Sequence, residues 1–171
     1  MDLFNLSEVL LGRVFIIPDY QREYSWGESQ LEAFYKDLSS CPSTTEHLMG
    51  SLLTVEYKET PDTHKSHLPN LENKQIFGLD NTPTTLHEVI DGQQRLTTLW
   101  LIFNYMHRSG YPDFRASYQL EYETRPGSHA YLQTLNEQEA VTNIDYFHLK
   151  AAHDAITEWF EASASNSQIR G

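Results

Sequence analysis

Residues 88–98 combine side chains that can bind an anion and position a water molecule. The segment reads as a buried strand, a short turn and a helix that begins at once. Asp91 is expected to cap this helix by accepting from the backbone N–H of Gln94, whose side chain would reciprocate as in a capping box. Gly92 has no Cβ and leaves its backbone open to a ligand. The free N–H groups of a first helical turn attract anions.

Arg95 adds a positive charge to the same turn. The helix dipole disfavours a cation there unless an anion lies between them, so the spacing predicts an anion site. A simpler interpretation stays open, in which Asp91 is only a cap and Arg95 a solvated charge. The Walker A pattern does not occur in the sequence, which excludes a P-loop NTPase.

A second cluster, residues 19–26, brings three aromatic side chains and an arginine into one loop. Tyr20, Tyr24 and Trp26 can stack on a base while Arg22 contacts a phosphate. The alternative is structural. Tyr24 and Trp26 would then cover the core, and Arg22 would pair with an acidic residue.

Composition limits the classes of protein to which the chain can belong. Its 171 residues include 12 basic and 24 acidic side chains, a net charge of −12. Non-specific nucleic-acid binding depends on many Lys and Arg side chains, so any anion site must be local. A single cysteine excludes an internal disulfide and a Cys-rich zinc site. The apolar runs are too short to span a membrane, and a cytoplasmic location without membrane partners is expected.

Apolar runs predict the strands. Residues 48–57 are apolar on both faces and predict a central strand, with Gly50 at a close approach of another backbone. Residues 86–90 predict a second strand and residues 118–122 a third. The polar residues between 58 and 83 predict a long loop.

Amphipathic stripes predict the helices. Ser25 and Glu28 have the spacing of a capping box for the helix that follows them. Asn143 is expected to cap the last helix, and residues 163–167 read as a solvated linker. The predicted buried stripe of that helix is Phe147, Ala151, Ala155 and Trp159.

Three segments, in this order, resemble a known family. Residues 17–26 (IPDYQREYSW) match its I-P-x-Y-Q-R-x-Y-x-W opening, residues 48–52 (LMGSL) its F-L-G-S-I strand, and residues 89–98 (VIDGQQRLTT) its V-I-D-G-Q-Q-R-L-T-T signature. The chain resembles the GmrSD-type restriction endonuclease N-terminal (GmrS) domains, whose fold is similar to that of ParB and sulfiredoxin. The resemblance implies an α/β fold, or α+β, in which helices flank a small mixed sheet and a C-terminal helical segment follows.

The resemblance also implies domain boundaries and a function. A nucleotide-binding domain is expected over residues 1–123, with a loop insertion at 58–83. The start of a helical segment, apparently truncated, is expected over residues 124–171. Such domains regulate modification-dependent, type IV-like DNA restriction and phage-defence proteins by binding, and hydrolysing, a nucleoside triphosphate.

Site residues carry over from the matching motifs. Those implied to contact the nucleotide are Tyr20, Gln21, Arg22, Gly92, Gln94 and Arg95. Those implied for catalysis are Asp91, Gln93, Gln94 and Arg95. The implied cofactors are GTP or ATP together with Mg²⁺ held by Asp91. Because ParB-like relatives carry a glutamate where this chain has Gln93 and Gln94, binding follows more directly than Mg²⁺-dependent hydrolysis.

The resemblance further implies an HNH nuclease domain or subunit as a partner outside this chain. None of the eight histidines lies in an HNH pattern, so nuclease activity is not expected here. A second hypothesis is a non-catalytic module that recognises modified DNA or docks a partner nuclease subunit. Tyr20, Tyr24 and Trp26 would then stack on the modified base.

Overall fold

The computed structural model describes residues 6–40, 48–56, 85–114, 116–123, 127–141 and 143–169. The predicted loop at 58–83 lies outside the described residues. The chain divides into two compact units that alternate along the sequence. The sheet unit comprises Met1–Arg22, Leu52–Gln93 and Ala116–Gln133. The helical unit comprises Glu23–Ser51, Gln94–Arg115 and Thr134–Gly171.

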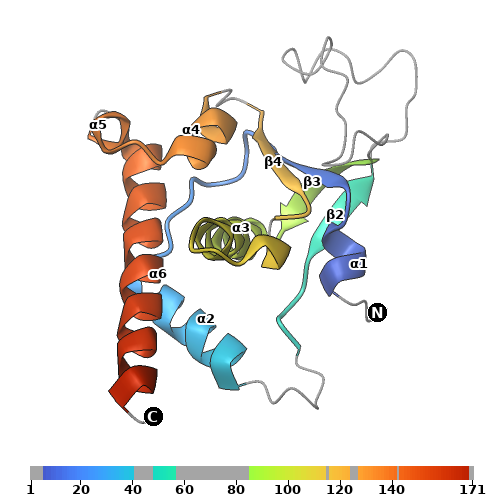
Figure 1. Cartoon of the computed structure of the whole chain (residues 1–171). Helices are drawn as coiled ribbons and strands as arrows, with labels where there is room; N and C mark the ends of the chain where they lie inside the picture. The colour runs from blue at the N-terminus through green and yellow to red at the C-terminus, as the bar shows by residue number, and fades with distance from the viewer. Residues whose placement is uncertain are drawn as a thin grey trace, which may run out of the picture. The chain divides into compact units, whose positions relative to one another are not determined.

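The sheet unit is built on a mixed four-stranded sheet in the order β2-β3-β1-β4 (Figure 1). Its strands are β1 (Arg13–Ile17), β2 (Leu53–Glu56), β3 (Thr85–Asp91) and β4 (Gln119–Tyr122). β1 runs parallel to both β3 and β4, and β2 is antiparallel to β3. Together with the helices, this sheet confirms the α/β class.

β1 occupies an interior position because of its side chains. Val14, Phe15, Ile16 and Ile17 are each at most 2% exposed, the continuous burial expected of a parallel strand that is covered on both faces. Phe15 pairs with His87 of β3 and with Leu120 of β4. The short helix α1 (Leu6–Leu10) precedes β1.

The strand predicted over residues 48–57 is wrong in extent and in position. Only Leu53–Glu56 is extended in the sheet, and β2 lies at its edge. Leu53 and Val55 are more than half exposed. Apolar residues on both faces indicated a covered strand, but here β2 has one neighbouring strand, β3, among the described residues.

The helical unit is formed by long helices that pack through aromatic rings. Tyr35 stacks on Trp159 at 4.8 Å, and Tyr105 stacks on Phe160 at 5.0 Å between ring centroids. The helices are α2 (Glu28–Ser40), α3 (Gln93–Arg108), η1 (Pro112–Phe114), α5 (Glu137–Ala140) and α6 (Ile144–Ile169). The first residue of α3 belongs to the sheet unit, and α4 (Ser128–Thr134) ends at the boundary between the units.

The structure corrects two predictions about α6. Its buried residues are Leu149, Ala152 and Ile156, whereas Phe147 is 54% exposed. The predicted stripe repeated strictly every four residues, and such a row drifts around a helix of 3.6 residues per turn. The predicted linker at 163–167 lies within α6, which continues to Ile169.

The start of α2 also differs from the prediction. The helix begins at Glu28, and the backbone N–H of Gly27 donates to Oε1 of Gln30 at 3.1 Å. Gln30 therefore makes the contact expected of Glu28, while Gly27, which has no side chain, cannot supply the side-chain acceptor expected of Ser25. This shift leaves the backbone of Ser25 available for another contact, described below.

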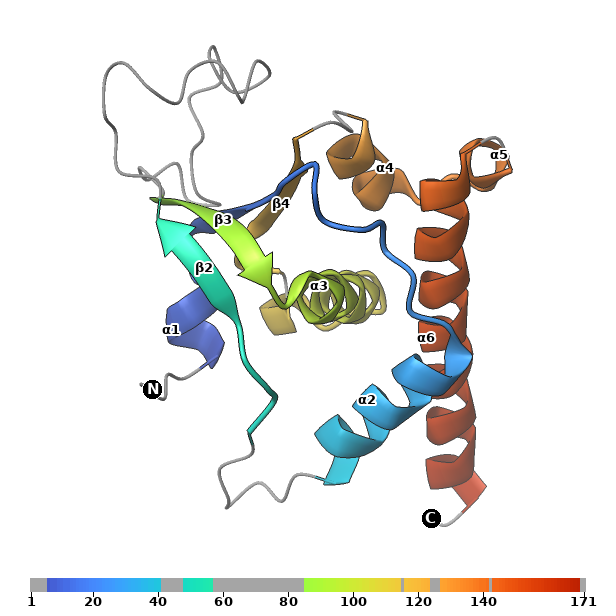
Figure 2. The same ribbon diagram turned by 180° about the vertical axis from the view of Figure 1, so that it is seen from behind.

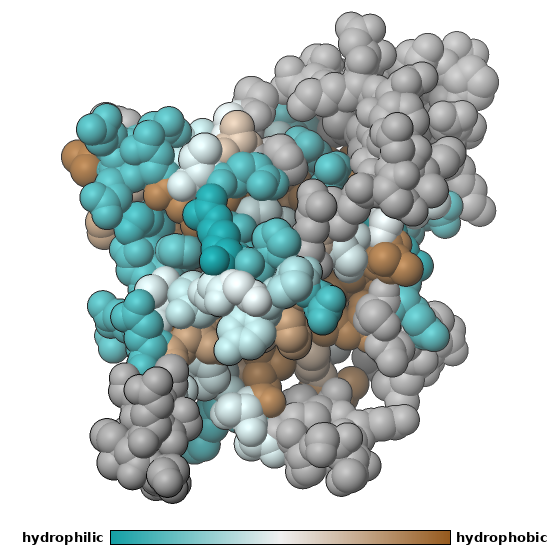
Figure 3. Space-filling view, in the orientation of Figure 1, coloured by the Kyte–Doolittle hydropathy of each residue, from teal (hydrophilic) through white to brown (hydrophobic). Residues whose placement is uncertain are grey.

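The surface over α5 and the beginning of α6 is mostly hydrophilic (Figure 3). Val141, the C-cap of α5, is an exception at 86% exposure. None of the helices in the described ranges is long and apolar enough to cross a membrane.

Acidification is expected to destabilise the fold through His87, which is buried in β3. Burial and the nearby Arg13 lower the pKa of His87, so the unfolded state takes up more protons below about pH 6.5. The free energy of unfolding should therefore fall between about pH 7.5 and pH 5.5, and His87→Gln should flatten this slope. Urea titrations at several pH values measure how the free energy of unfolding depends on pH. His107→Gln, at an exposed position, is the control and should keep the wild-type slope.

Candidate functional site

A single residue connects β3 to α3. β3 ends at Asp91 and α3 begins at Gln93, so the chain passes directly from strand to helix (Figure 2). Gly92 makes this turn with φ +104°, a conformation that side chains with a Cβ rarely adopt. The predicted strand, turn and helix are confirmed here. The position before the helix is occupied by Gly92, one residue later than the predicted cap at Asp91.

Gln94 holds the aromatic loop within the helical unit. Its Nε2 donates to the carbonyl oxygen of Glu23 at 2.9 Å, and its Oε1 accepts from the backbone N–H of Ser25 at 2.9 Å. The side chain is only 9% exposed. Since the carboxamide is engaged with the loop at both ends, Gln94 is not the reciprocal partner of Asp91 that the capping-box prediction required.

Gln93, in contrast to Gln94, has a carboxamide that makes no hydrogen bond to the described residues. It is 3% exposed, and neither its Nε2 nor its Oε1 has a hydrogen-bond partner among the described residues. A buried polar group without a partner costs about 1–3 kcal/mol. The two adjacent glutamines, identical in type, therefore differ in function: Gln94 fixes the backbone, and Gln93 retains its full hydrogen-bonding capacity at the first position of α3.

Within the sheet unit, the loop after β1 is tied to the end of β3. Nε2 of Gln21 donates to the carbonyl oxygen of Ile90 at 2.8 Å. The hydroxyl of Tyr20 donates to Oε1 of Glu88 at 2.6 Å. This hydrogen bond to Glu88 raises the pKa of Tyr20 to about 12, so the phenol stays neutral. The Tyr20 side chain is 62% exposed.

The remaining aromatic residues of the loop belong to the helical unit and serve its core. Tyr24 is 2% exposed, and its hydroxyl lies 2.8 Å from Oγ1 of Thr98. Trp26 packs edge-on against Phe34 at 5.3 Å between ring centroids. Tyr24 is thus a core residue and is removed from the side chains considered for stacking on a base. Tyr20 is the exposed ring of the loop.

Two residues of this region escaped the sequence interpretation. Glu88 orients Tyr20, and Thr98 pairs with the buried hydroxyl of Tyr24. No clear signal for Glu88 was available in the sequence, because its strand also contains other polar residues, among them His87. Thr98 gave none, because a threonine on a helix is ordinary.

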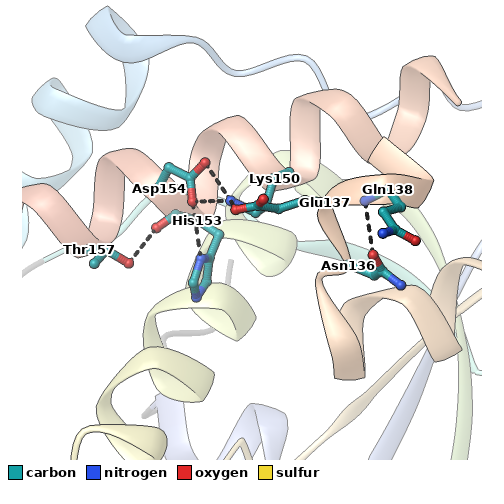
Figure 4. A network of polar contacts seen from close by, with 7 residues as sticks. All are labelled: Asn136, Glu137, Gln138, Lys150, His153, Asp154 and Thr157. Atoms are coloured by element: carbon teal, nitrogen blue, oxygen red, sulfur yellow. Dashed lines mark hydrogen bonds and ion pairs between the residues drawn. The ribbon is translucent and has the colours of Figure 1, made fainter. Parts of the chain in front are cut away.

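A separate polar cluster lies on α5 and α6 (Figure 4). Nζ of Lys150 donates to both carboxylate oxygens of Asp154 at 2.6 and 2.7 Å, and lies 3.7 Å from Oε1 of Glu137. His153, whose Nδ1 is 3.7 Å from the same carboxylate, is partly buried, and burial lowers its pKa. Lys150 thus pairs with two carboxylates, one on α5 and one on its own helix α6.

A magnesium ion at Asp91 would need further ligands from a bound molecule. The described part of the chain contains no group of three or more His, Cys, Asp or Glu side chains that could hold a metal. Asp91 is exposed at the end of β3. Mg²⁺ commonly binds one or two carboxylates together with phosphate oxygens of a substrate, and Asp91 can supply one of these.

Comparison with known proteins identifies the family. The family described as the GmrSD restriction endonuclease, N-terminal domain, matches residues 2–169, which is nearly the whole chain. Neither a curated protein nor a solved structure matches the chain.

Isosteric substitutions of the two glutamines should have different effects on stability. Gln94→Met removes both hydrogen bonds to the loop and should lower the free energy of unfolding by about 1–3 kcal/mol. Gln93→Met loses no hydrogen bond of the described structure and should leave stability unchanged or raise it. Urea denaturation of both proteins measures this. Equal destabilisation by the two changes would contradict the distinction.

Proposed function

Since the chain belongs to the family of GmrSD restriction endonuclease N-terminal domains, it is part of a restriction and phage-defence protein, and we propose that it binds a nucleoside triphosphate at the turn between β3 and α3. The proposal rests on the chemical groups that residues 88–95 bring to this turn. These residues supply a helix N-terminus, a bare glycine, an unpartnered carboxamide and an arginine.

The buried carboxamide of Gln93 is the observation that carries the proposal. Its Nε2 and Oε1 are desolvated and unpartnered, so folding leaves a cost that a bound ligand can offset. A carboxamide both donates and accepts, and so it suits a phosphate oxygen together with a water or hydroxyl group. At the first residue of a 16-residue helix, it lies where backbone N–H groups and the dipole favour an anion.

The charged residues of the turn fit the phosphate end of such a ligand. Arg95, in the first turn of α3, supplies a guanidinium that can pair with phosphate oxygens. Gly92, which is buried, places no Cβ at this turn. Asp91 would hold Mg²⁺, which neutralises the phosphates when it is bound.

The loop after β1 fits the base end. Tyr20 is an exposed neutral ring whose hydroxyl is fixed by Glu88, and aromatic faces stack on bases. The Glu88 carboxylate disfavours phosphates near this ring. Asp91 lies three positions after Glu88 on β3, about 10 Å along an extended strand, which places base and phosphate contacts at different points.

Hydrolysis is the second part of the proposal. A glutamine is a weak base, but it can orient an attacking water toward a phosphate, as in other nucleotide hydrolases. Gln93 is suited to this because its carboxamide is unpartnered. Gln94 is not, since both ends of its carboxamide hold the loop.

A second candidate function is recognition of a modified base in DNA without catalysis. The exposed ring of Tyr20 favours it, whereas the burial of Tyr24 removes one predicted stacking surface. Affinity for DNA should fall steeply with salt, while a nucleotide site formed by a few groups should respond much less.

Isothermal titration with GTP, ATP, CTP and UTP in the presence of Mg²⁺ tests the proposal. We expect saturable binding of at least one nucleotide, and a loss of about tenfold or more in affinity for Gln93→Met, because one buried hydrogen-bonding group is worth about 1–3 kcal/mol. Arg95→Ala should abolish binding. Gln138→Ala, at an exposed position of α5, is the control and should bind like the wild type.

Release of inorganic phosphate then separates an enzyme from a sensor. Binding without release would leave nucleotide sensing and reject hydrolysis. If the wild type binds no nucleotide but binds modified DNA with a steep salt dependence, the second candidate replaces the first.

A further inference from the structure

Gly50 lies against the side chain of Arg95 within the helical unit. A Cβ atom built on Gly50 would clash with Nη1 of Arg95 and would lie 3.2 Å from Cζ and 3.7 Å from Cδ. The guanidinium therefore occupies the space in which any other residue would have its side chain. The close approach predicted at Gly50 is made by this side chain, where the sequence interpretation expected another backbone.

Gly50 also has φ +104°, so its backbone conformation alone favours glycine. Two separate constraints thus meet at this position, one on the backbone and one on the space beside it. Only the second involves Arg95. The distinction matters because Arg95 has a long side chain with many rotamers, and fixing it lowers the entropy lost when a ligand binds.

We propose that Gly50 is a positioning residue for Arg95. Because Gly50 has no side chain, it leaves a space that holds the Arg95 guanidinium beside the first turn of α3, and we call this space the seat. Gly50 itself touches no ligand in this assignment. It acts on phosphate binding through Arg95, so this effect rests on the proposed nucleotide site. The seat itself is a property of the free protein and is testable without any ligand.

The chain offers a matched control for the backbone constraint. Gly110, also in the helical unit, has φ +95°, and a Cβ built on it would meet nothing within 4 Å. Gly110→Ala therefore introduces comparable backbone strain without obstructing a guanidinium. If the two substitutions differ in their effect on stability or on Arg95, the difference comes from the contact with Arg95 and not from backbone strain.

The test combines these two substitutions with Arg95→Ala in a double-mutant cycle on the full chain. Urea midpoints should show that Gly50→Ala is slightly less destabilising in the Arg95→Ala background, because no guanidinium then has to shift, while Gly110→Ala shifts the midpoint equally in both backgrounds. The Nε–Hε resonance of Arg95 in nitrogen-15 NMR spectra of the ligand-free protein should move or broaden in Gly50→Ala and stay unchanged in Gly110→Ala. Nucleotide affinity should fall about tenfold in Gly50→Ala, as expected when one charged contact is misplaced.

Several outcomes would overturn the assignment. Equal destabilisation by Gly50→Ala in both backgrounds, with an unchanged Arg95 resonance, would mean that the glycine serves the backbone alone. If Gly50→Ala does not fold, the double variant with Arg95→Ala should fold, and its failure would lead to the same conclusion. If the wild type binds no nucleotide, the proposed function fails while the cycle and the resonance still decide whether the seat exists.

Discussion

The direct connection from β3 to α3 through Gly92 constrains everything around the site. β3 lies between β1 and β2 in the sheet. Its pairing with β1 extends to Glu88, and its pairing with β2 continues to Asp91, the last residue of β3. With only Gly92 between strand and helix, α3 must begin where β3 ends. The 16-residue helix therefore begins at Gln93, with one residue between it and the last residue of β3.

Carboxamides stabilise the segments on both sides of this connection. In the sheet unit, Gln21 bonds to the carbonyl oxygen of Ile90. In the helical unit, Gln94 bonds to the main chain of Glu23 and Ser25. Each glutamine ties the loop after β1 to the connection, but through main-chain groups that any sequence would supply. Gln93 is the exception, because neither polar atom of its buried carboxamide has a hydrogen-bond partner among the described residues.

The sequence predicted the regular parts of this arrangement well and the irregular parts poorly. Strand 86–90 and the following helix could be predicted because a buried strand, a glycine and an amphipathic stripe follow in order. The strand at 48–57 was placed at the centre of the sheet because apolar residues do not distinguish an edge strand with half-exposed Leu53 and Val55 from a covered one. Sequence also could not separate Gln93 from Gln94, since their difference lies entirely in which partners the fold brings to each carboxamide.

The acidic composition limits how such a site can attract an anion. With a net charge of −12, the chain offers no long-range field that draws in phosphates, and Glu88 and Asp91 place two carboxylates on β3 itself. Binding must then rely on groups that act only at contact: backbone N–H groups at a helix end, one guanidinium and one desolvated carboxamide. Contact interactions depend on exact placement, since a hydrogen bond weakens steeply when its angle is wrong. The affinity of a site of this kind therefore depends on the residues that fix the positions of its few binding groups. Gly50 fixes the position of Arg95, and Gly92 sets the backbone conformation just before Gln93.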